Sequence, residues 1–419
     1  MPDAADPTAF WDMARALSLV GDTLVRVDAE DRPQPALAVE WQRDASSRHW
    51  QFLLRPVKFH DGSWASPAAI AQILGALHPT WTVRATTMGA GARPGQSGGD
   101  SITIDTDVAW PSLPAELALP RNLMLKRDSN GIPIGTGPFR VTDFQPGRSL
   151  KLTASDESWA GRPYIDGVEI EFGKSLREQG LGLELGRVDL AEAAPDAGNG
   201  SARERTSMSL RVELMALVFT PNSRVRDVRA REALALAIDR RPIQLVLLKG
   251  AGEPAASILP NWMTGYSGAF STQQNIARAK TLLAEAGTPA ITMSYDARDP
   301  QAQLIAERLA LNAREAGISV QVSLSGPEDV RLVRIALPSP DPALALREVA
   351  RELSLGEPSV RGNSVEELFA AERSLLDAHN AIPLFHVPVA SAAGPRVRGW
   401  LAGRLGLWDI ADVWLEDGR

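Results

Sequence analysis

The spacing of hydrophobic positions predicts both helices and strands along this chain. Residues 9–20 and 228–249 carry apolar side chains at helical spacing, so each is expected to be a helix. Residues 23–27 and 318–324 alternate apolar and polar side chains, as strands with one buried face do. Helical and strand segments alternate through the sequence, which indicates mixed α/β layers.

Local start and stop signals place further elements. A serine before proline opens one helix, glycines end two others, and a serine–glutamate capping box opens a fourth. The four helices are 67–77 after Ser66, 276–286 before Gly287, 302–316 before Gly317, and 364–379 with Ser364 and Glu367. The expected strands are 50–54, 58–59, 101–105, 139–144, 149–154 and 382–390, and the glycine-rich stretch 88–100 is expected to be a surface loop.

Composition narrows the class of protein. At roughly 150 residues per domain, 419 residues predict two or three domains. The net charge of −7 argues against nucleic acid as a partner and against an anionic-membrane patch. The chain has no cysteine, which excludes disulfides, thiolate catalysis and cysteine metal sites.

Catalytic signals are weak, so we expect no enzyme, no metal site and no cofactor. The sequence has no nucleophile elbow, zinc-binding helix or phosphate loop. Its five histidines are scattered, and His60-Asp61-Gly62 has the composition of a turn at a strand end. Among eleven tryptophans, those near expected loops are the best candidates for a ligand cleft. These are Trp81, Trp110 and Trp262.

Several separated motifs point in one direction. They resemble, in order, the signatures of the family 5 extracellular solute-binding proteins, the oligopeptide-, dipeptide- and nickel-binding receptors of ABC importers. The motifs are TLVRVDAEDRPQPALAVEWQRDASSRHWQFLLRPVKFHDGS (23–63), IGTGPFRVTDFQPGRSLKL with SWAGRPYIDGVEIEF (134–172), GRVDLA (186–191), FTPNSRVRDVRAREALALAIDRRPI (219–243), and IPLFHVPVASAAGPRVRGW with ADVWLED near the end. Relative to the family pattern the chain is shortened near 88–100 and 326–339.

The resemblance implies an α/β, two-lobed periplasmic-binding-protein-like fold with an inserted small subdomain and a cleft between the lobes. Lobe one would comprise 1–27, 121–218 and 386–419, the inserted subdomain 28–120, and lobe two 219–385. The first and last segments would pack in the same lobe. The glycine pair of the I-G-T-G-P turn would serve a sharp backbone bend and is interpreted as structural.

The resemblance also implies a function. The expected protein is a monomeric, periplasmic receptor that delivers a small peptide or similar solute to ABC importer permease subunits, although the N-terminus shows no secretory signal. The alternative is an intracellular ligand-sensing domain of a regulator with this fold.

Four residues are expected at the ligand. Asp341, in the acidic P-D-P turn, matches the family position that pairs with a ligand's α-ammonium group, and its alternative role is to cap a helix at Ala343. Trp110 and Arg121 flank the return from the inserted subdomain to lobe one, and Arg121 would offer a fork to a ligand carboxylate. Asn222 stands at the entry to lobe two.

Overall fold

The chain folds into two compact units. The structure is a computed structural model that describes residues 13–28, 32–87, 99–193, 205–297, 299, 301–360, 362–400 and 408–416. Unit 1 holds the described residues of 1–173, 397–401 and 407–419, and unit 2 holds those of 174–396. Both ends of the described chain therefore belong to unit 1, while the finer three-part division expected from the sequence stays a prediction.

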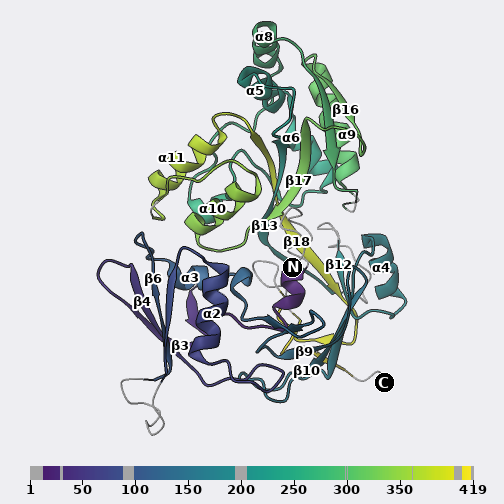
Figure 1. Cartoon of the computed structure of the whole chain (residues 1–419). Coiled ribbons are helices and arrows are strands. Elements are labelled where there is room, and N and C mark those ends of the chain that lie inside the picture. The colour runs from purple at the N-terminus through teal and green to yellow at the C-terminus, as the bar shows by residue number, and fades with distance from the viewer. Residues whose placement is uncertain are drawn as a thin grey trace. The chain divides into compact units, whose positions relative to one another are not determined.

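Unit 1 contains two antiparallel sheets and short paired segments (Figure 1). A four-stranded sheet in the order β3-β4-β6-β5 packs against helix α2, with Phe52, Ile70 and Ile102 fully buried between them. Its elements are β3 (Ala38–Arg43), β4 (His49–Leu54), α2 (Pro67–Leu77), β5 (Thr82–Thr86) and β6 (Ser101–Asp105). The other sheet joins β9 (Phe139–Gln145), β10 (Ser149–Ala154) and β11 (Gly167–Glu171).

Short elements complete unit 1. They are the pairs β1 (Val25–Val27) with β2 (Pro33–Pro35), β7 (Lys126–Arg127) with β8 (Pro133–Ile134), and β19 (Val397–Arg398) with β20 (Trp414–Leu415), together with α3 (Leu113–Leu117) and the 3₁₀ turn η1 (Pro120–Asn122). The C-terminal segment is held by the N–H of Tyr164, which donates to the carbonyl of Ala411 at 3.2 Å. This bond is one reason why residues distant in sequence share the unit.

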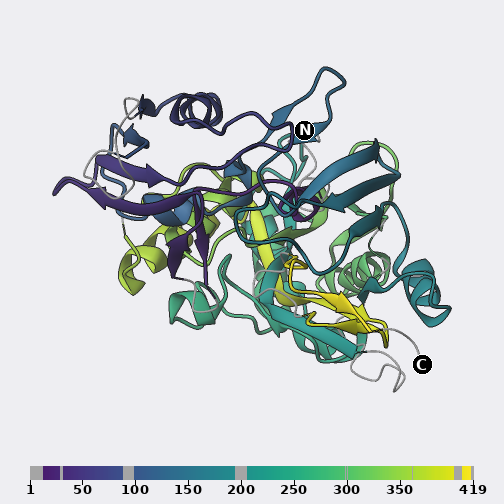
Figure 2. The same ribbon diagram turned by 90° about the horizontal axis from the view of Figure 1, so that it is seen from below.

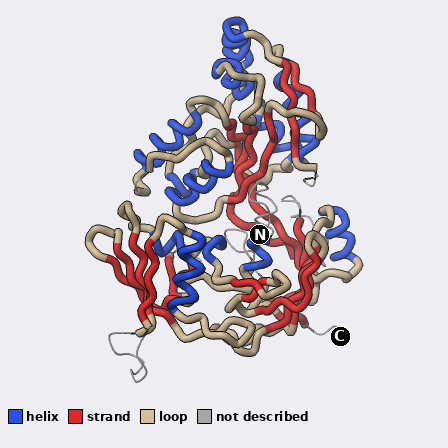
Figure 3. Tube along the Cα trace, viewed as in Figure 1, coloured by secondary structure: helices blue, strands red, loops and turns tan. Residues whose placement is uncertain are grey.

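Unit 2 is built on a seven-stranded sheet with helices on both faces (Figure 3). The strand order is β12-β18-β13-β17-β15-β16, and β14 pairs with β18. The long strands β13 and β18 lie antiparallel at its centre (Figure 2). The strands are β12 (Leu190–Ala193), β13 (Arg205–Phe219), β14 (Glu253–Pro254), β15 (Ala290–Tyr295), β16 (Ser319–Val322), β17 (Val330–Ala336) and β18 (Ala381–Ala393).

Alternation along β13 and β17 supplies a separate core to each face of this sheet. Leu217 and Leu332 point into a core with α5, α8 and α9, whereas Ala216 and Ile335 point into a core with α10 and α11. The helices are α4 (Leu176–Glu184), α5 (Val228–Ala237), α6 (Arg240–Pro242), the π-helix η3 (Ile243–Leu247), α7 (Asn261–Thr264), α8 (Ile276–Ala286), α9 (Ala302–Glu315), α10 (Pro342–Glu352) and α11 (Val365–Leu376). Among all described residues, no helix is both long and apolar enough to cross a membrane.

The expected single helix over 228–249 was wrong. The helix α5 ends at Ala237, and Ile238 takes an extended conformation with ψ of 119°. Arg240 then turns inward, where it is 4% exposed, and its Nη2 donates to the carbonyl of Pro383 in β18 at 2.9 Å. Burying this arginine against β18 breaks the helix, and the chain continues as α6 and η3.

Candidate functional site

Arg121, one of the four expected ligand residues, is bound to a buried carboxylate. Glu116 in α3 is 0% exposed. The guanidinium of Arg121 grips it with a fork, because Nε lies 2.9 Å from Oε1 and Nη2 lies 2.6 Å from Oε2. A ligand carboxylate that bound Arg121 in the same two-bonded way would need these same N–H donors. The structure thus gives Arg121 a partner inside unit 1, and its contact with a ligand stays a prediction.

An aromatic stack lies beside this ion pair and contains Trp110. The rings of His78 and Trp81 stack with centroids 3.6 Å apart and planes 4° apart. Trp81 in turn meets Trp110 edge to face at 5.6 Å. Trp81 is only 7% exposed, so it packs in the core, whereas Trp110 is half-buried.

Hydrogen bonds join the aromatic stack to the ion pair. Nε2 of His78 donates to Oδ1 of Asn122 at 2.6 Å. The side-chain Nδ2 of Asn122 donates a hydrogen bond to the backbone carbonyl of Glu116 at 2.5 Å. The fold therefore brings Trp110 and Arg121 into one connected cluster, which the sequence spacing had not shown.

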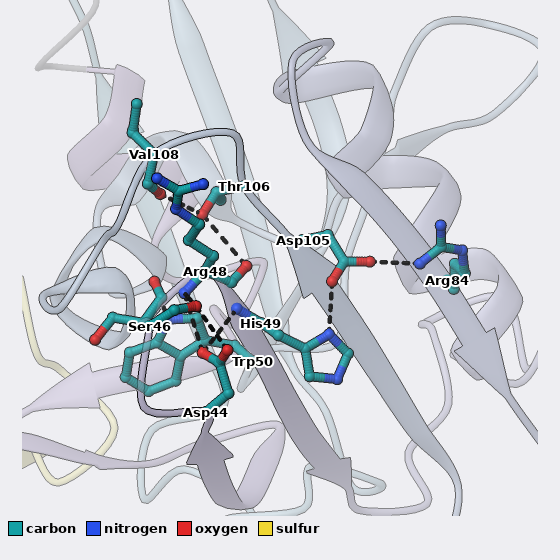
Figure 4. A network of polar contacts seen from close by, with 10 residues as sticks. Asp44, Ser46, Arg48, His49, Trp50, Arg84, Asp105, Thr106 and Val108 are labelled. Atoms are coloured by element: carbon teal, nitrogen blue, oxygen red, sulfur yellow. Dashed lines mark hydrogen bonds and ion pairs between the residues drawn. The ribbon is translucent and has the colours of Figure 1, made fainter.

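The turn between β3 and β4 carries a network of hydrogen bonds (Figure 4). Asp44 accepts hydrogen bonds from Ser46 and from the backbone of Arg48, and these bonds lower the pKa of the Asp44 carboxyl, the Ser46 hydroxyl contributing most. The carbonyl of Ser47 accepts the N–H of Trp110 at 2.8 Å. A second group in the same view, His49–Asp105–Arg84, lies on the exposed face of the sheet. The first network therefore positions Trp110, and the second pairs β4, β5 and β6 at the surface.

Asn222 is exposed in the turn that follows β13 in unit 2. Asp329, whose side chain is 3% exposed, fixes this turn. Its Oδ1 accepts the N–H of Arg224 at 2.9 Å and its Oδ2 accepts the N–H of Thr292 at 2.8 Å. The side chain of Arg224 also pairs with Asp329 at 2.5 Å. A buried carboxylate thus holds the loop that presents Asn222.

Acidification is expected to loosen the Asn222 turn. Burial opposes ionisation of Asp329, but hydrogen bonds from Arg224 and Thr292 outweigh it and lower the pKa from 3.8 to about 2. The folded state therefore binds fewer protons than the unfolded state in this range. The stabilisation is complete above about pH 4 and is lost as the pH falls through about 2, which amounts to ~2 kcal/mol.

Urea unfolding of the wild type and Asp329→Asn between pH 5 and 2 measures this contribution. The variant should lack part of the wild-type pH dependence, since all other carboxyls are shared. Equal pH dependence in the two proteins would contradict the assignment to Asp329.

Asp341 caps helix α10. Its Oδ1 accepts the N–H of Leu344 at 2.9 Å, and its Oδ2 accepts the side-chain amide of Asn363 at 2.9 Å. Both carboxylate oxygens therefore have donors in unit 2. The cap, which was the alternative role expected from the sequence, is present, and a bond to a ligand's ammonium group stays a prediction.

Removing this cap is expected to destabilise unit 2. Asp341→Ala should lower the free energy of unfolding by about 1 kcal/mol, because the N–H of Leu344 loses its acceptor. Asp341→Ser keeps a capping oxygen and should retain most of the stability. Urea unfolding of the three proteins tests this, and an unchanged midpoint for Asp341→Ala would refute the capping role.

A further polar group, which the sequence did not reveal, centres on the half-buried Asp22. Its Oδ2 accepts hydrogen bonds from Oγ1 of Thr136 at 2.8 Å and from Nε1 of Trp159 at 3.0 Å. These partners lie 114 and 137 positions from Asp22 in the sequence. Burial raises the pKa of this carboxyl. Thr136 belongs to the I-G-T-G-P turn, so this turn closes over Asp22. The I-G-T-G-P motif could be recognised in the sequence, but no residue near Asp22 in the sequence indicated that Asp22 would contact it.

His60 joins the same turn. Its backbone N–H donates to the carbonyl of Gly135 at 2.9 Å, and its ring Nε2 donates to the carbonyl of Gly137 at 2.9 Å. Burial lowers the pKa of the imidazole, which favours its neutral form. The adjacent Asp61 pairs with Lys126 instead, and that bond lowers the pKa of Asp61 to about 2. His60 and Asp61 therefore bind different partners, the I-G-T-G-P turn and Lys126.

The described residues hold no group of three or more His, Asp or Glu side chains placed to bind a metal ion. Asn222 and Asp341 lie in unit 2, at the end of β13 and at the start of α10, and the two expected residues of unit 1 form one cluster. These four residues could offer a ligand hydrogen bonds and contact with an aromatic ring. Trp262 lies half-buried in α7.

Comparison with known proteins places the chain among binding proteins. The model of the bacterial extracellular solute-binding proteins, family 5 middle, matches residues 32–333. Nickel-binding protein NikA of Staphylococcus aureus is 28% identical over 240 residues, which are 54% of this chain and 48% of that protein. Peptide transport periplasmic protein SapA of Salmonella typhimurium is 26% identical over 203 residues, 45% of this chain and 37% of that protein. The chain thus matches about half or less of the length of these curated relatives.

A solved structure shows the shared fold. NikA from Staphylococcus aureus, in complex with Ni(L-His)2, superposes with a TM-score of 0.81 over 96% of both chains at 19% identity. The predicted α/β, two-lobed binding-protein fold is thereby confirmed.

Proposed function

Because this chain belongs to the bacterial extracellular solute-binding proteins of family 5, we propose that it is the receptor that delivers a peptide-like solute to an ABC importer. It binds the solute reversibly, does not change it chemically, and acts outside the cytoplasm as a monomer. Its protein partners are the permease subunits of that importer.

The family match over residues 32–333 carries this proposal. The relatives compared above are named as binding and transport proteins, and one of them is named for peptide transport. None of them is a regulator, so no observation favours the intracellular ligand-sensing alternative. Trp110, Arg121, Asn222 and Asp341 remain the proposed ligand residues.

The experiment is a ligand screen by thermal unfolding. A mixture of di- to pentapeptides should raise the midpoint, because a ligand present at about 100 times its Kd adds roughly 2.7 kcal/mol to the stability of the folded state. Calorimetric titration of the active fraction then gives stoichiometry, and mass spectrometry checks that the peptide is recovered intact. Cleaved peptide would contradict a pure binding function, and the absence of any shift would exclude peptides as the solute.

A metal complex is the second candidate solute. Both oxygens of Asp341 already accept hydrogen bonds within unit 2, which weakens the expected anchor for a peptide's ammonium group. The solved NikA structure holds Ni(L-His)2, so the metal solute to test is nickel together with L-histidine. Thermal shifts with NiCl2, with L-histidine and with both together distinguish this case, since only the mixture should stabilise the protein.

A further inference from the structure

Residues 255–270 form a long connection between β14 and α8 in unit 2, which we call the 255–270 connection. Within these described residues, α7 is the only helix or strand. The apolar side chains of Ile258 and Leu259 are buried in the core that also contains α10 and α11. Trp262, one of the tryptophans selected from the sequence, lies in α7. With so little regular structure, the connection depends on contacts with its neighbours for its conformation.

A buried carboxyl group of α11 holds the connection on both sides of α7. Helix α11 (Figure 1) supplies Glu372, which is 0% exposed. Its Oε1 accepts the backbone N–H of Leu259 at 2.8 Å, and its Oε2 accepts the hydroxyl of Tyr266 at 2.8 Å. Leu259 precedes α7 and Tyr266 follows it. This one side chain therefore attaches both ends of α7 to α11.

Two further side chains of α11 support the attachment. Nη1 of Arg373 donates to the carbonyl of Ala269 at 3.0 Å. The guanidinium carbon of Arg373 also lies 4.3 Å from the centre of the Phe270 ring. Phe369 meets the ring of Tyr266 edge to face at 5.3 Å. Positions 369, 372 and 373 share one face of a helix, so this face of α11 carries the connection.

Glu372 has hydrogen-bond donors but no cation. No ion pair joins it to any residue in the described part of the chain. Burial favours the neutral acid, whereas hydrogen bonds from Leu259, Tyr266 and Ser257 favour the carboxylate. Burial is the stronger effect and raises the pKa of Glu372 from 4.5 to about 7. Burial and the neighbouring Glu372 also raise the pKa of Tyr266, so its hydroxyl keeps the proton that it donates.

Two histidines touch the connection at other points. Nε2 of His386 in β18 donates to the carbonyl of Ile258 at 3.0 Å, and its Nδ1 lies 4.0 Å from a carboxylate oxygen of Glu253 in β14. The ring of His379, which follows α11, packs against Phe270 with centroids 5.3 Å apart. These histidines bind the connection through groups other than those that contact Glu372.

The charged groups of the neighbouring helix α10 have partners of their own. Arg347 donates to the carbonyl of Val360 at 2.9 Å, and Glu348 pairs with Arg351. Glu352 is a second buried carboxyl group, and burial, followed by repulsion from Glu348, raises its pKa to about 7. Glu352 therefore titrates in the same range as Glu372 without contacting the connection through any hydrogen bond between described residues. This makes it a matched control.

We propose that Glu372 makes the attachment of the 255–270 connection to α11 sensitive to pH, so that the connection is held firmly in acid and loosens as the pH rises through neutrality. When the connection detaches, the carboxyl group enters water, where its pKa is 4.5. The attached state therefore binds more protons than the detached state between about pH 4.5 and 7, and a rising pH favours detachment. This inference is independent of the solute and of the importer.

Hydrogen exchange of the full chain, followed by mass spectrometry of peptides from 255–270, measures the attachment. Protection factors of the wild type should fall at least about tenfold between pH 5 and pH 8. Glu372→Gln keeps an acceptor for the N–H of Leu259 and does not ionise, so its protection should change less than about twofold over this range. Glu352→Gln should retain the wild-type fall.

Tyr266→Phe provides a second variant, which preserves the ring and removes one donor. A hydrogen bond to a carboxylate is stronger than one to the neutral acid, so protection should drop more at pH 8 than at pH 5. An equal drop at the two pH values would contradict ionisation of Glu372 in the attached state.

Amides of α5 serve as an internal reference in the same unit and should keep constant protection. If they lose protection in parallel with the connection, the whole unit opens, and a local attachment is excluded. Constant protection of 255–270 in the wild type overturns the proposal. A fall that persists in Glu372→Gln also overturns it and assigns the pH dependence to the histidines.

Discussion

Gly135→Ala is expected to lower the free energy of unfolding of unit 1 by about 4 kcal/mol or more. A Cβ at this position would lie 2.1 Å from the carbonyl oxygen of Val20 and 2.7 Å from its carbonyl carbon. These are backbone atoms, so no side-chain rotation relieves the clash. The same oxygen accepts the N–H of Gly137 at 2.8 Å, so a shift of Val20 would also break that bond.

Gly75→Ala, in α2 of the same unit, is the matched control. A Cβ there meets no atom within 4 Å, and alanine should stabilise the helix by roughly 0.5–1 kcal/mol. Urea unfolding followed by tryptophan fluorescence compares the two variants. If Gly135→Ala unfolds within about 1 kcal/mol of the wild type, the close approach to Val20 is not the reason for this glycine.

Arg121→Ala is expected to cost about 3–5 kcal/mol, because it leaves the carboxylate of Glu116 buried without its cation. Asn122 still donates to Oε1 at 3.2 Å, but a neutral amide does not compensate a buried charge. Glu116→Gln/Arg121→Met removes both charges and should recover much of the stability.

The two measurements for Arg121 separate a structural role from a ligand role. A structural ion pair lowers the urea midpoint of the single variant and spares the solute affinity of the refolded double variant. If Arg121→Ala instead keeps the wild-type midpoint and loses solute affinity in calorimetry, the guanidinium serves the ligand, as expected from the sequence.

Some local signals predicted helix ends correctly, whereas contacts between residues distant in sequence were missed. The predicted bounds of α2 and α8 agree with the structure because Ser66, Pro67 and Gly287 act within one turn of their helices. The helix after Ser364 is shorter than expected, Val365–Leu376, and the reciprocal capping box forms instead at Ser175 and Glu178. The break after α5 depends on Pro383, which lies 143 positions from Arg240 and leaves no local trace.

The same limit applies to the candidate site. The cap at Asp341 was foreseen as an alternative because Asp341 and its helix are adjacent in sequence. The ion pair between Glu116 and Arg121 was missed because a turn, rather than a helical spacing, brings them together. The glycines of the I-G-T-G-P turn are structural as predicted, but Gly135 and Gly137 are needed for close approach to Val20 and not for a left-handed bend.

The position of β18 has a consequence for how the chain folds. This strand lies between β12 and β13 and pairs Ala393 with Leu190 and Ala381 with Val218, so β12 cannot join the unit 2 sheet until residue 393 has been made. At roughly 5–20 residues per second, the sheet of unit 2 is completed only when synthesis is nearly finished, and pairing over such separations is slow. For the extracytoplasmic location proposed above, we expect this delay to favour export of the chain before unit 2 has closed.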